Sequence, residues 1–162
     1  MKRSEFLVPL SWEHHSALVN ANRIKLGVLN GGKVEDIREF IVYIWQHDLF
    51  PHFEREERII LGHQEAAKLP AEIKEQVLKE HERFADIFDR IGRGDVQTEL
   101  MGYFKTFADL LISHVRFEES SFFPAVEKVF SGESLREIGK TLRAQHVPGC
   151  ITWQPVFWKK QK

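Results

Sequence analysis

The sequence predicts an all-α protein: an antiparallel, up-down four-helix bundle followed by a short additional C-terminal helix and a tail. Apolar residues recur every three or four positions along four long stretches, as they do on the buried face of a helix. Breaks that contain Gly, Asn or Pro separate these stretches. The same polar motifs also occur in the same order in both halves of the chain, as expected for two helical hairpins related by a pseudo-twofold axis.

Length and composition favour one ordinary globular domain. The chain has 162 residues, enough for one well-cored domain and too few for two, so we expect a single domain over residues 1–162. The bundle is predicted at about 10–130, and the extra helix and docking tail at about 131–162. A net charge of -1 gives no field that would attract nucleic acid or an anionic membrane.

The sequence also predicts a cytoplasmic location. No apolar run approaches the roughly 18 residues of a membrane span, and the N-terminal region lacks the apolar centre of a signal peptide. The single cysteine, Cys150, cannot form an internal disulfide, which fits a reducing compartment. His146 lies four residues before Cys150, but Pro148 and Gly149 would break a helix there, so a metal role for that pair is disfavoured.

The first predicted helix spans about residues 10–29 and carries two adjacent histidines. His14 falls on the apolar stripe and should point inward. His15 shares its face with polar residues and should lie nearer the surface, so His14 is favoured as the ligand and His15 is the alternative. The Asn-Gly-Gly sequence at 30–32 then ends the helix.

The second predicted helix is longer, about residues 34–59, and carries His52 and Glu56 on its inner stripe. Pro51 stands directly before His52. Because proline removes one backbone hydrogen bond, we expect a kink in this helix and a free carbonyl near the histidine.

The second half repeats this organisation. A turn ends at Leu69-Pro70, and a third helix runs to about Ile91 with His81 on its apolar face. Residues 92–95 close that helix, and a fourth follows with His114 and Glu118 on its inner stripe. A shorter helix at about 134–145 is expected to pack across the bundle, followed by an aromatic tail that should dock on it.

The duplicated motifs predict a metal site. In His52-x-x-x-Glu56 and His114-x-x-x-Glu118 the two side chains lie one helical turn apart on the same face and can share one ion. A Glu-His pair on each of the other two helices supplies His14 and His81. Imidazole and carboxylate ligands suit iron, manganese or zinc. The candidate ligands are therefore His14, His52, Glu56, His81, His114 and Glu118.

A structural alternative is that these core histidines and glutamates only pair with each other. One polar layer in an otherwise apolar core is costly without a cation, which favours the metal site. The remaining histidines, His47, His63 and His146, are expected at the surface or at hinges. Glu57 and Glu119 lie about 100° around their helices from the candidate ligands and should either support them or be solvated.

The order of these motifs resembles the hemerythrin-like family across most of the chain. The resemblance implies an antiparallel four-helix bundle that holds a non-haem di-iron centre. It also implies that His14 and His52 bind one iron and His81 and His114 the other, with Glu56 and Glu118 bridging. A ferritin-like di-iron bundle is disfavoured because no histidine has a glutamate three residues before it.

The chain departs from the oxygen-carrying members of that family. Those members have a second histidine four residues from the one in the third helix, where this sequence has Val77 and Ala85. A glutamate, Glu119, also stands where the carriers have an aspartate. One iron would therefore lack a ligand, which argues against reversible oxygen carriage. The vacant position could hold water, an oxygen-derived ligand or nitric oxide.

Three functions remain open at this point. The leading hypothesis is a protein that binds two irons and, through them, dioxygen or nitric oxide, in sensing, storage or protection. The second is a di-iron enzyme that reduces peroxide or nitric oxide, for which an open coordination position would serve directly. The third is a metal-free helical interaction module that uses the aromatic tail.

Overall fold

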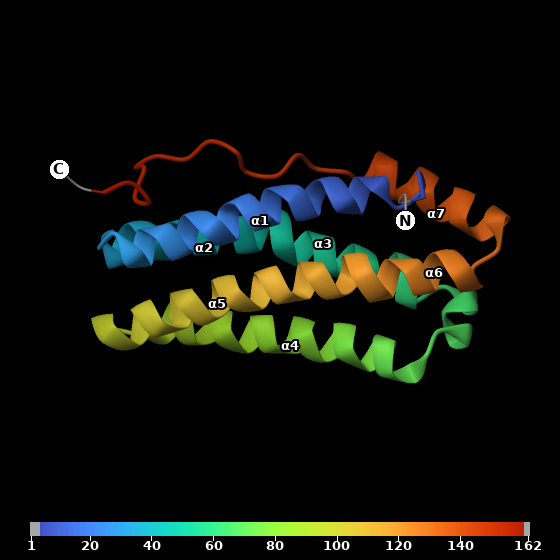
Figure 1. The fold of residues 1–162 in the computed structure, drawn as a ribbon, viewed down its shortest axis with the longest axis horizontal. Helices are drawn as coiled ribbons and strands as arrows, with labels where there is room; N and C mark the ends of the chain where they lie inside the picture. The colour runs from blue at the N-terminus through green and yellow to red at the C-terminus, as the bar shows by residue number, and fades with distance from the viewer. Residues whose placement is uncertain (1–3, 161–162) are drawn as a thin grey trace.

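The computed structural model describes residues 4–160, and within that range the chain is helical with no strand, which confirms the all-α prediction. The helices lie lengthwise along one axis, with α1 packed against α5 and α5 against α4 (Figure 1). The elements are α1 (Val8–Leu29), α2 (Val34–Ile44), η1 (Trp45–Leu49), α3 (Phe50–Arg55), η2 (Glu56–Leu61), η3 (Gln64–Lys68), α4 (Ala71–Arg93), α5 (Gln97–Phe117), η4 (Glu118–Phe122), α6 (Phe123–Val129) and α7 (Gly132–Ala144).

Two of the predicted long helices contain π-helical turns. The second runs continuously from α2 to η2 through the π-helical stretches η1 and η2, and the fourth contains η4 between α5 and α6. Pro51 and Pro124 each stand at the second residue after a π-helical stretch. Proline has no N–H to donate, and the wider π-helical hydrogen-bond pattern accommodates that loss without ending the helix.

The hydrophobic core is divided into two clusters along the long axis. One contains Phe40, Phe84 and Phe107 among α1, α2, α4 and α5. The other contains Leu10 and Phe122 and extends beneath α7. Polar side chains from the motifs occupy the level between these clusters, so apolar layers enclose them on both sides.

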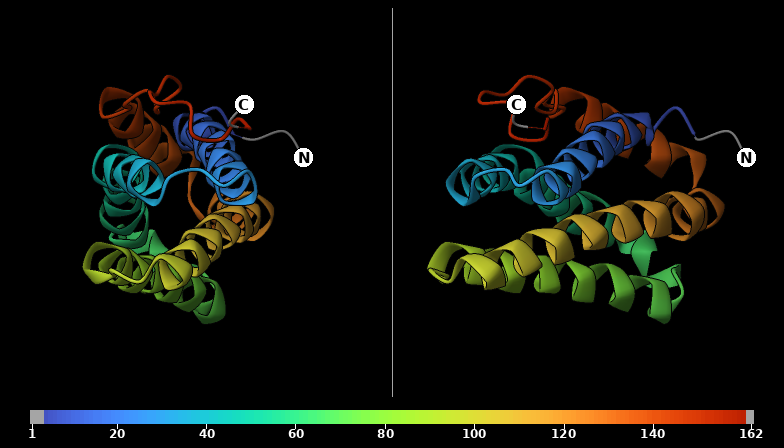
Figure 2. Two further views of the ribbon diagram at one scale, coloured as in Figure 1. Left: turned by 90° about the vertical axis from the view of Figure 1, so that its left-hand side faces the viewer. Right: turned by 60° about the vertical axis from the view of Figure 1, so that its left-hand side comes forward.

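The C-terminal region returns along the bundle. Helix α7 packs on α1, and the segment after it runs back beside α1 towards the α1–α2 turn (Figures 1 and 2). Phe157 is fully buried and contacts Phe40, with ring centroids 5.2 Å apart. A Cβ at Gly27 would lie 2.5 Å from the Phe157 ring, so only glycine leaves room for this aromatic side chain. The predicted aromatic tail therefore docks through Phe157.

No helix among residues 4–160 is both long enough and apolar enough to cross a membrane. The turn between α1 and α2 contains Gly31 with φ of 70°, a conformation that favours glycine, as the Asn-Gly-Gly break predicts.

Candidate metal centre

The structure brings all six predicted ligand residues together in the core, and each is buried. They form two overlapping groups, in each of which the potential ligand atoms lie within 4.8 Å of one another. Glu56 and Glu118 belong to both groups. The first group adds His14 and His52, and the second adds His81 and His114.

Local structure places these side chains at one level. His52 lies in α3 and His114 near the end of α5, and in each case the glutamate four residues later begins a π-helical stretch. π-Helical turns are uncommon and occur frequently at functional sites. Both halves of the chain therefore use the same local geometry at the glutamate.

Each shared glutamate reaches both halves of the centre. One oxygen of Glu56 lies 3.2 Å from His52 Nε2, and the other lies 3.4 Å from His81 Nε2. The oxygens of Glu118 lie 3.0 Å from His14 Nε2 and 3.2 Å from His114 Nε2. This is the arrangement that two carboxylates bridging two ions would need.

The donor set fits a cation better than internal pairing. Although these contacts are short, they are poorly aligned as hydrogen bonds. Both oxygens of Glu56 and of Glu118 are buried without a hydrogen-bond partner within residues 4–160. The Nε2 atoms of His81 and His114 are also buried without a hydrogen-bond partner among these residues. Unpaired buried polar atoms are costly, and their convergence indicates a group that would satisfy them all.

The outer nitrogen of every candidate histidine has a carboxylate partner. The Nδ1 atoms of His14, His52, His81 and His114 lie 2.6 to 2.7 Å from a glutamate oxygen. Because a carboxylate only accepts, each Nδ1–H donates outward and each Nε2 faces the centre. The partners are Glu119 for His14, Glu13 for His52, Glu57 for His81 and Glu80 for His114.

This geometry also requires positive charge between two of the imidazoles. The Nε2 atoms of His14 and His52 are 3.1 Å apart. With both Nδ1–H groups donated outward, neutral rings would direct two lone pairs at each other. Either a proton or a metal ion must therefore lie between them.

The electrostatics of the centre agree with that requirement. Burial alone would lower the pKa of His52, but the neighbouring Glu56 and Glu13 raise it to about 10. Burial would also lower the pKa of His14 and His81, and contacts with glutamates raise both. For Glu56, the effect of burial is outweighed by His52 and His81, which hold its pKa well below the usual range. Protons supply positive charge in the metal-free protein, and metal ions would displace them.

Two aromatic rings support histidines from the side. Phe53 stacks on His81 with ring centroids 4.1 Å apart, and Phe123 stacks on His14 at 5.2 Å. Val77, one turn before His81, is fully buried, whereas Ala85, one turn after it, is exposed. Neither residue can bind a metal ion through its side chain, because both side chains are hydrocarbon.

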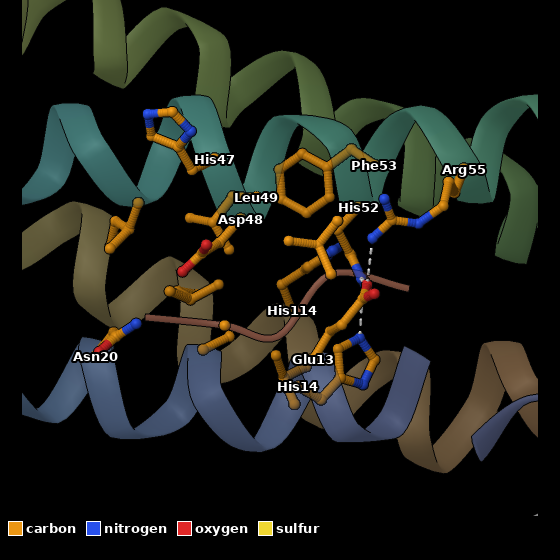
Figure 3. Close-up of a pocket in the computed structure, with 16 residues that line it drawn as sticks. Glu13, His14, Asn20, His47, Asp48, Leu49, His52, Phe53, Arg55 and His114 are labelled. Carbon is orange, nitrogen blue, oxygen red and sulfur yellow. Dashed lines mark hydrogen bonds and ion pairs between the residues drawn. The ribbon is translucent and has the colours of Figure 1, made fainter. Parts of the chain in front are cut away.

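A small pocket lies beside the centre and is lined by His14 and His52 of the first group and by His114 of the second. Its free space is about 20 Å³, which is room for about one water-sized molecule. Glu13, His14 and His52 lie at one end, and Asn20, His47 and Asp48 lie at the other (Figure 3). The tail residues Val147 and Gly149 complete the wall, and a Cβ at Gly149 would lie 2.4 Å from Ser16 Cβ.

The remaining histidines take different positions. His15 and His47 are exposed, so the structure places His14 rather than its neighbour in the centre. The Nδ1 atom of His63 accepts the Glu65 N–H at the start of η3, so this histidine caps a helix. His146 is half-buried, and its Nδ1 lies 3.0 Å from Glu13 Oε1. The sequence pattern did not indicate that link, because the segment carrying His146 lacks helical periodicity.

A comparison with protein families finds one match. The profile of the hemerythrin HHE cation binding domain matches residues 10–126, well over half of the chain, and this range includes all six candidate ligands. No curated protein and no solved structure matches the chain.

Proposed function

Because the chain belongs to the hemerythrin HHE cation-binding domain family, we propose that it is a non-haem di-iron-binding protein. His14 and His52 would hold one iron, His81 and His114 the other, and Glu56 and Glu118 would bridge them. The observation that carries this proposal is the pair of overlapping ligand groups that share two buried glutamates, whose oxygens make no hydrogen bond within residues 4–160. We infer that the lengthwise helices form the antiparallel, up-down four-helix bundle of the family.

The choice of two irons follows from the ligand groups and the family together. Each group offers two imidazoles and two carboxylates, a set that iron accepts and that manganese or zinc also accepts. Two groups that share carboxylates predict two ions per chain. Metal availability in the cell contributes to the choice between these elements.

We propose dioxygen or nitric oxide as the ligand, in sensing, storage or protection. When bound, a di-iron pair supplies an open coordination position at which such a molecule can bind. The chain supplies a pocket lined by His14, His52 and His114 and by apolar residues such as Ala17, Leu111 and Val115. Its free space of about 20 Å³ has room for a molecule as small as water or a diatomic gas. Such a protein needs no nucleic acid or membrane partner and would act in the cytoplasm.

A second candidate is reduction of peroxide or nitric oxide at the same centre. The pocket favours this reaction as much as binding, because both ligands are small enough to enter it. Turnover separates the two functions: a binding protein consumes one equivalent per site, whereas an enzyme consumes many. The third hypothesis, a bundle whose histidines and glutamates merely pair, would leave both oxygens of Glu56 and of Glu118 without a hydrogen bond within residues 4–160.

The ligand assignment is tested with a matched histidine pair. His52→Ala removes a buried candidate ligand, and His15→Ala removes an exposed histidine next to His14. We expect His52→Ala to lower the metal content and the melting temperature of the metal-loaded protein, while His15→Ala retains both. Titration of each reduced protein with nitric oxide should give a spectral change only where metal is present. Equal metal content in both variants would refute the assignment.

A further inference from the structure

We propose that Glu13, Glu57, Glu80 and Glu119 are positioning residues that set the metal affinity of the centre by fixing its four histidines before metal binds. This inference rests on the proposed metal site. None of these glutamates belongs to the two groups of potential ligands, so their role is separate from coordination.

The four contacts form a closed ring around the bundle. Glu13 of α1 holds His52 of α3, and Glu57, which follows in η2, holds His81 of α4. Glu80 of α4 then holds His114 of α5, and Glu119 of η4 returns to His14 of α1. Each glutamate therefore fixes a histidine on the next long helical stretch, and the last one closes the circle.

The ring explains why the sequence repeats Glu-His and His-x-x-x-Glu-Glu as units. Each unit supplies an inner candidate ligand and an outer glutamate for a neighbouring stretch. A carboxylate on Nδ1 selects one tautomer, directs Nε2 towards the centre and makes the imidazole a stronger ligand. Contacts between helices thus orient all four histidines.

The members of the ring are not equivalent. The side chains of Glu13 and Glu80 are 10% and 18% exposed, whereas those of Glu119 and Glu57 are 33% and 45% exposed. Water weakens a hydrogen bond at an exposed carboxylate more than at a buried one. The glutamates of the two Glu-His pairs should therefore contribute most to metal affinity.

The carboxylate of Glu13 has further partners besides His52. The Arg55 guanidinium lies 2.6 Å from the Glu13 oxygen that contacts His52. The second oxygen of Glu13 contacts His146, so this member also ties the C-terminal segment to the centre.

The test compares Glu80→Gln with Glu82→Gln, which changes an exposed glutamate on the same helix. Glutamine keeps the shape of the side chain and can still accept from Nδ1–H, but it lacks the charge. We expect Glu80→Gln to weaken iron(II) binding by about 10- to 100-fold in competition with a chelator, and Glu82→Gln to leave it unchanged. Glu13→Gln should match Glu80→Gln, and Glu57→Gln should show a smaller loss.

Two further readouts separate positioning from a general effect on stability. The Nδ1–H protons of metal-bound histidines give exchangeable, paramagnetically shifted NMR signals in the di-iron(II) protein. We expect Glu80→Gln to move the signal of one histidine and to leave the others in place. Unfolding of the metal-free protein in urea then shows whether the fold itself has changed. If Glu80→Gln does not fold, the more exposed Glu57→Gln serves in the same measurements.

The outcomes distinguish this inference from the proposed function. Wild-type protein that binds no iron would overturn the metal site itself. Wild-type protein that binds two irons, with Glu80→Gln and Glu13→Gln equal to Glu82→Gln in affinity and spectrum, would overturn only the ring. A loss of affinity that matches the loss of metal-free stability, with all histidine signals unmoved, would also overturn it.

Discussion

Replacing Phe157 by alanine should release the C-terminal segment and open the pocket beside the centre. Phe157 is fully buried at the far end of that segment, where Gly27 makes room for its ring. Between Phe157 and α7, Val147 and Gly149 form part of the pocket wall. The Cys150 N–H donates to Asp48 on the facing helix at 3.0 Å. Loss of the Phe157 anchor should therefore loosen this part of the pocket wall, because the segment that forms it is not helical.

The expected destabilisation follows from complete burial. Removing a fully buried phenylalanine side chain costs about 3–5 kcal/mol when the cavity does not collapse. For a chain of this size each kcal/mol lowers the melting temperature by ~2–4 °C, so the upper bound is a fall of ~6–20 °C. Because a terminal segment can detach without unfolding the helices, the global loss should lie below that bound.

The assay combines two measurements on Phe157→Ala. Urea unfolding followed by helical circular dichroism reports global stability, and amide hydrogen exchange at Cys150 reports detachment of the segment. Leu29→Ala is the control, since Leu29 is 78% exposed near the same end of α1. Exchange at Cys150 should accelerate in Phe157→Ala alone. Unchanged exchange, together with a stability equal to that of Leu29→Ala, would refute the proposed anchoring.

The remaining predictions concern charge and helix packing. The metal-free protein should lose stability as the pH rises from about 6.5 to about 10. Burial opposes protonation of His52, but Glu56 and Glu13 outweigh it and raise its pKa to about 10. The stabilisation from this proton is therefore fully present below about pH 6.5 and is lost as the pH rises to about 10. Urea unfolding in chelator across this range measures the effect, and constant or rising stability would contradict it. Gly102→Ala should stabilise α5 by about 0.5–1 kcal/mol, because the new Cβ meets nothing within 4 Å. Gly139→Ala should instead destabilise the protein by about 1–3 kcal/mol, because its Cβ would lie 2.8 Å from Phe6 Cα. Thermal unfolding of the two variants should therefore show shifts of opposite sign.

Much of the fold could be predicted because helical periodicity is strong in this sequence. The first predicted helix, at about 10–29, differs from α1 only at its beginning, and the short helix at about 134–145 corresponds to α7. The π-helical turns could not be predicted from a period of 3.6 residues. Pro51 and Pro124 remove backbone donors just after η1 and η4, but η2 is followed by Gly62 and His63. Whether a helix kinks or widens at a proline depends on tertiary packing.

The candidate ligands could be predicted from the sequence, whereas the glutamates that contact the histidine Nδ1 atoms could not be assigned to their partners. The candidate ligands lie on apolar stripes, so burial and convergence follow from the same pattern that predicts the helices. The partner of each Nδ1 depends on the relative rotation of two different helices, which no spacing within one helix reveals. Glu57 and Glu119 were accordingly predicted only to support the centre or to be solvated, and the structure places each on a histidine of another helix.

The link between His146 and Glu13 has a similar origin. His146 follows the last helix, in a segment without periodicity, and its contact depends on the course of that segment along α1. The sequence indicated an aromatic tail that should dock on the bundle. It carried no signal for where the segment crosses the bundle, so the wall of the pocket became visible only in the structure.

Metal content per chain tests the central claim most directly. Inductively coupled plasma mass spectrometry on untagged protein, purified without chelator, measures iron, manganese and zinc together. The two overlapping ligand groups predict two metal ions per chain, and we propose that they are iron. A stably folded protein that contains no metal and takes up none from iron(II) would contradict the account and leave the histidines as the partners of the buried glutamates.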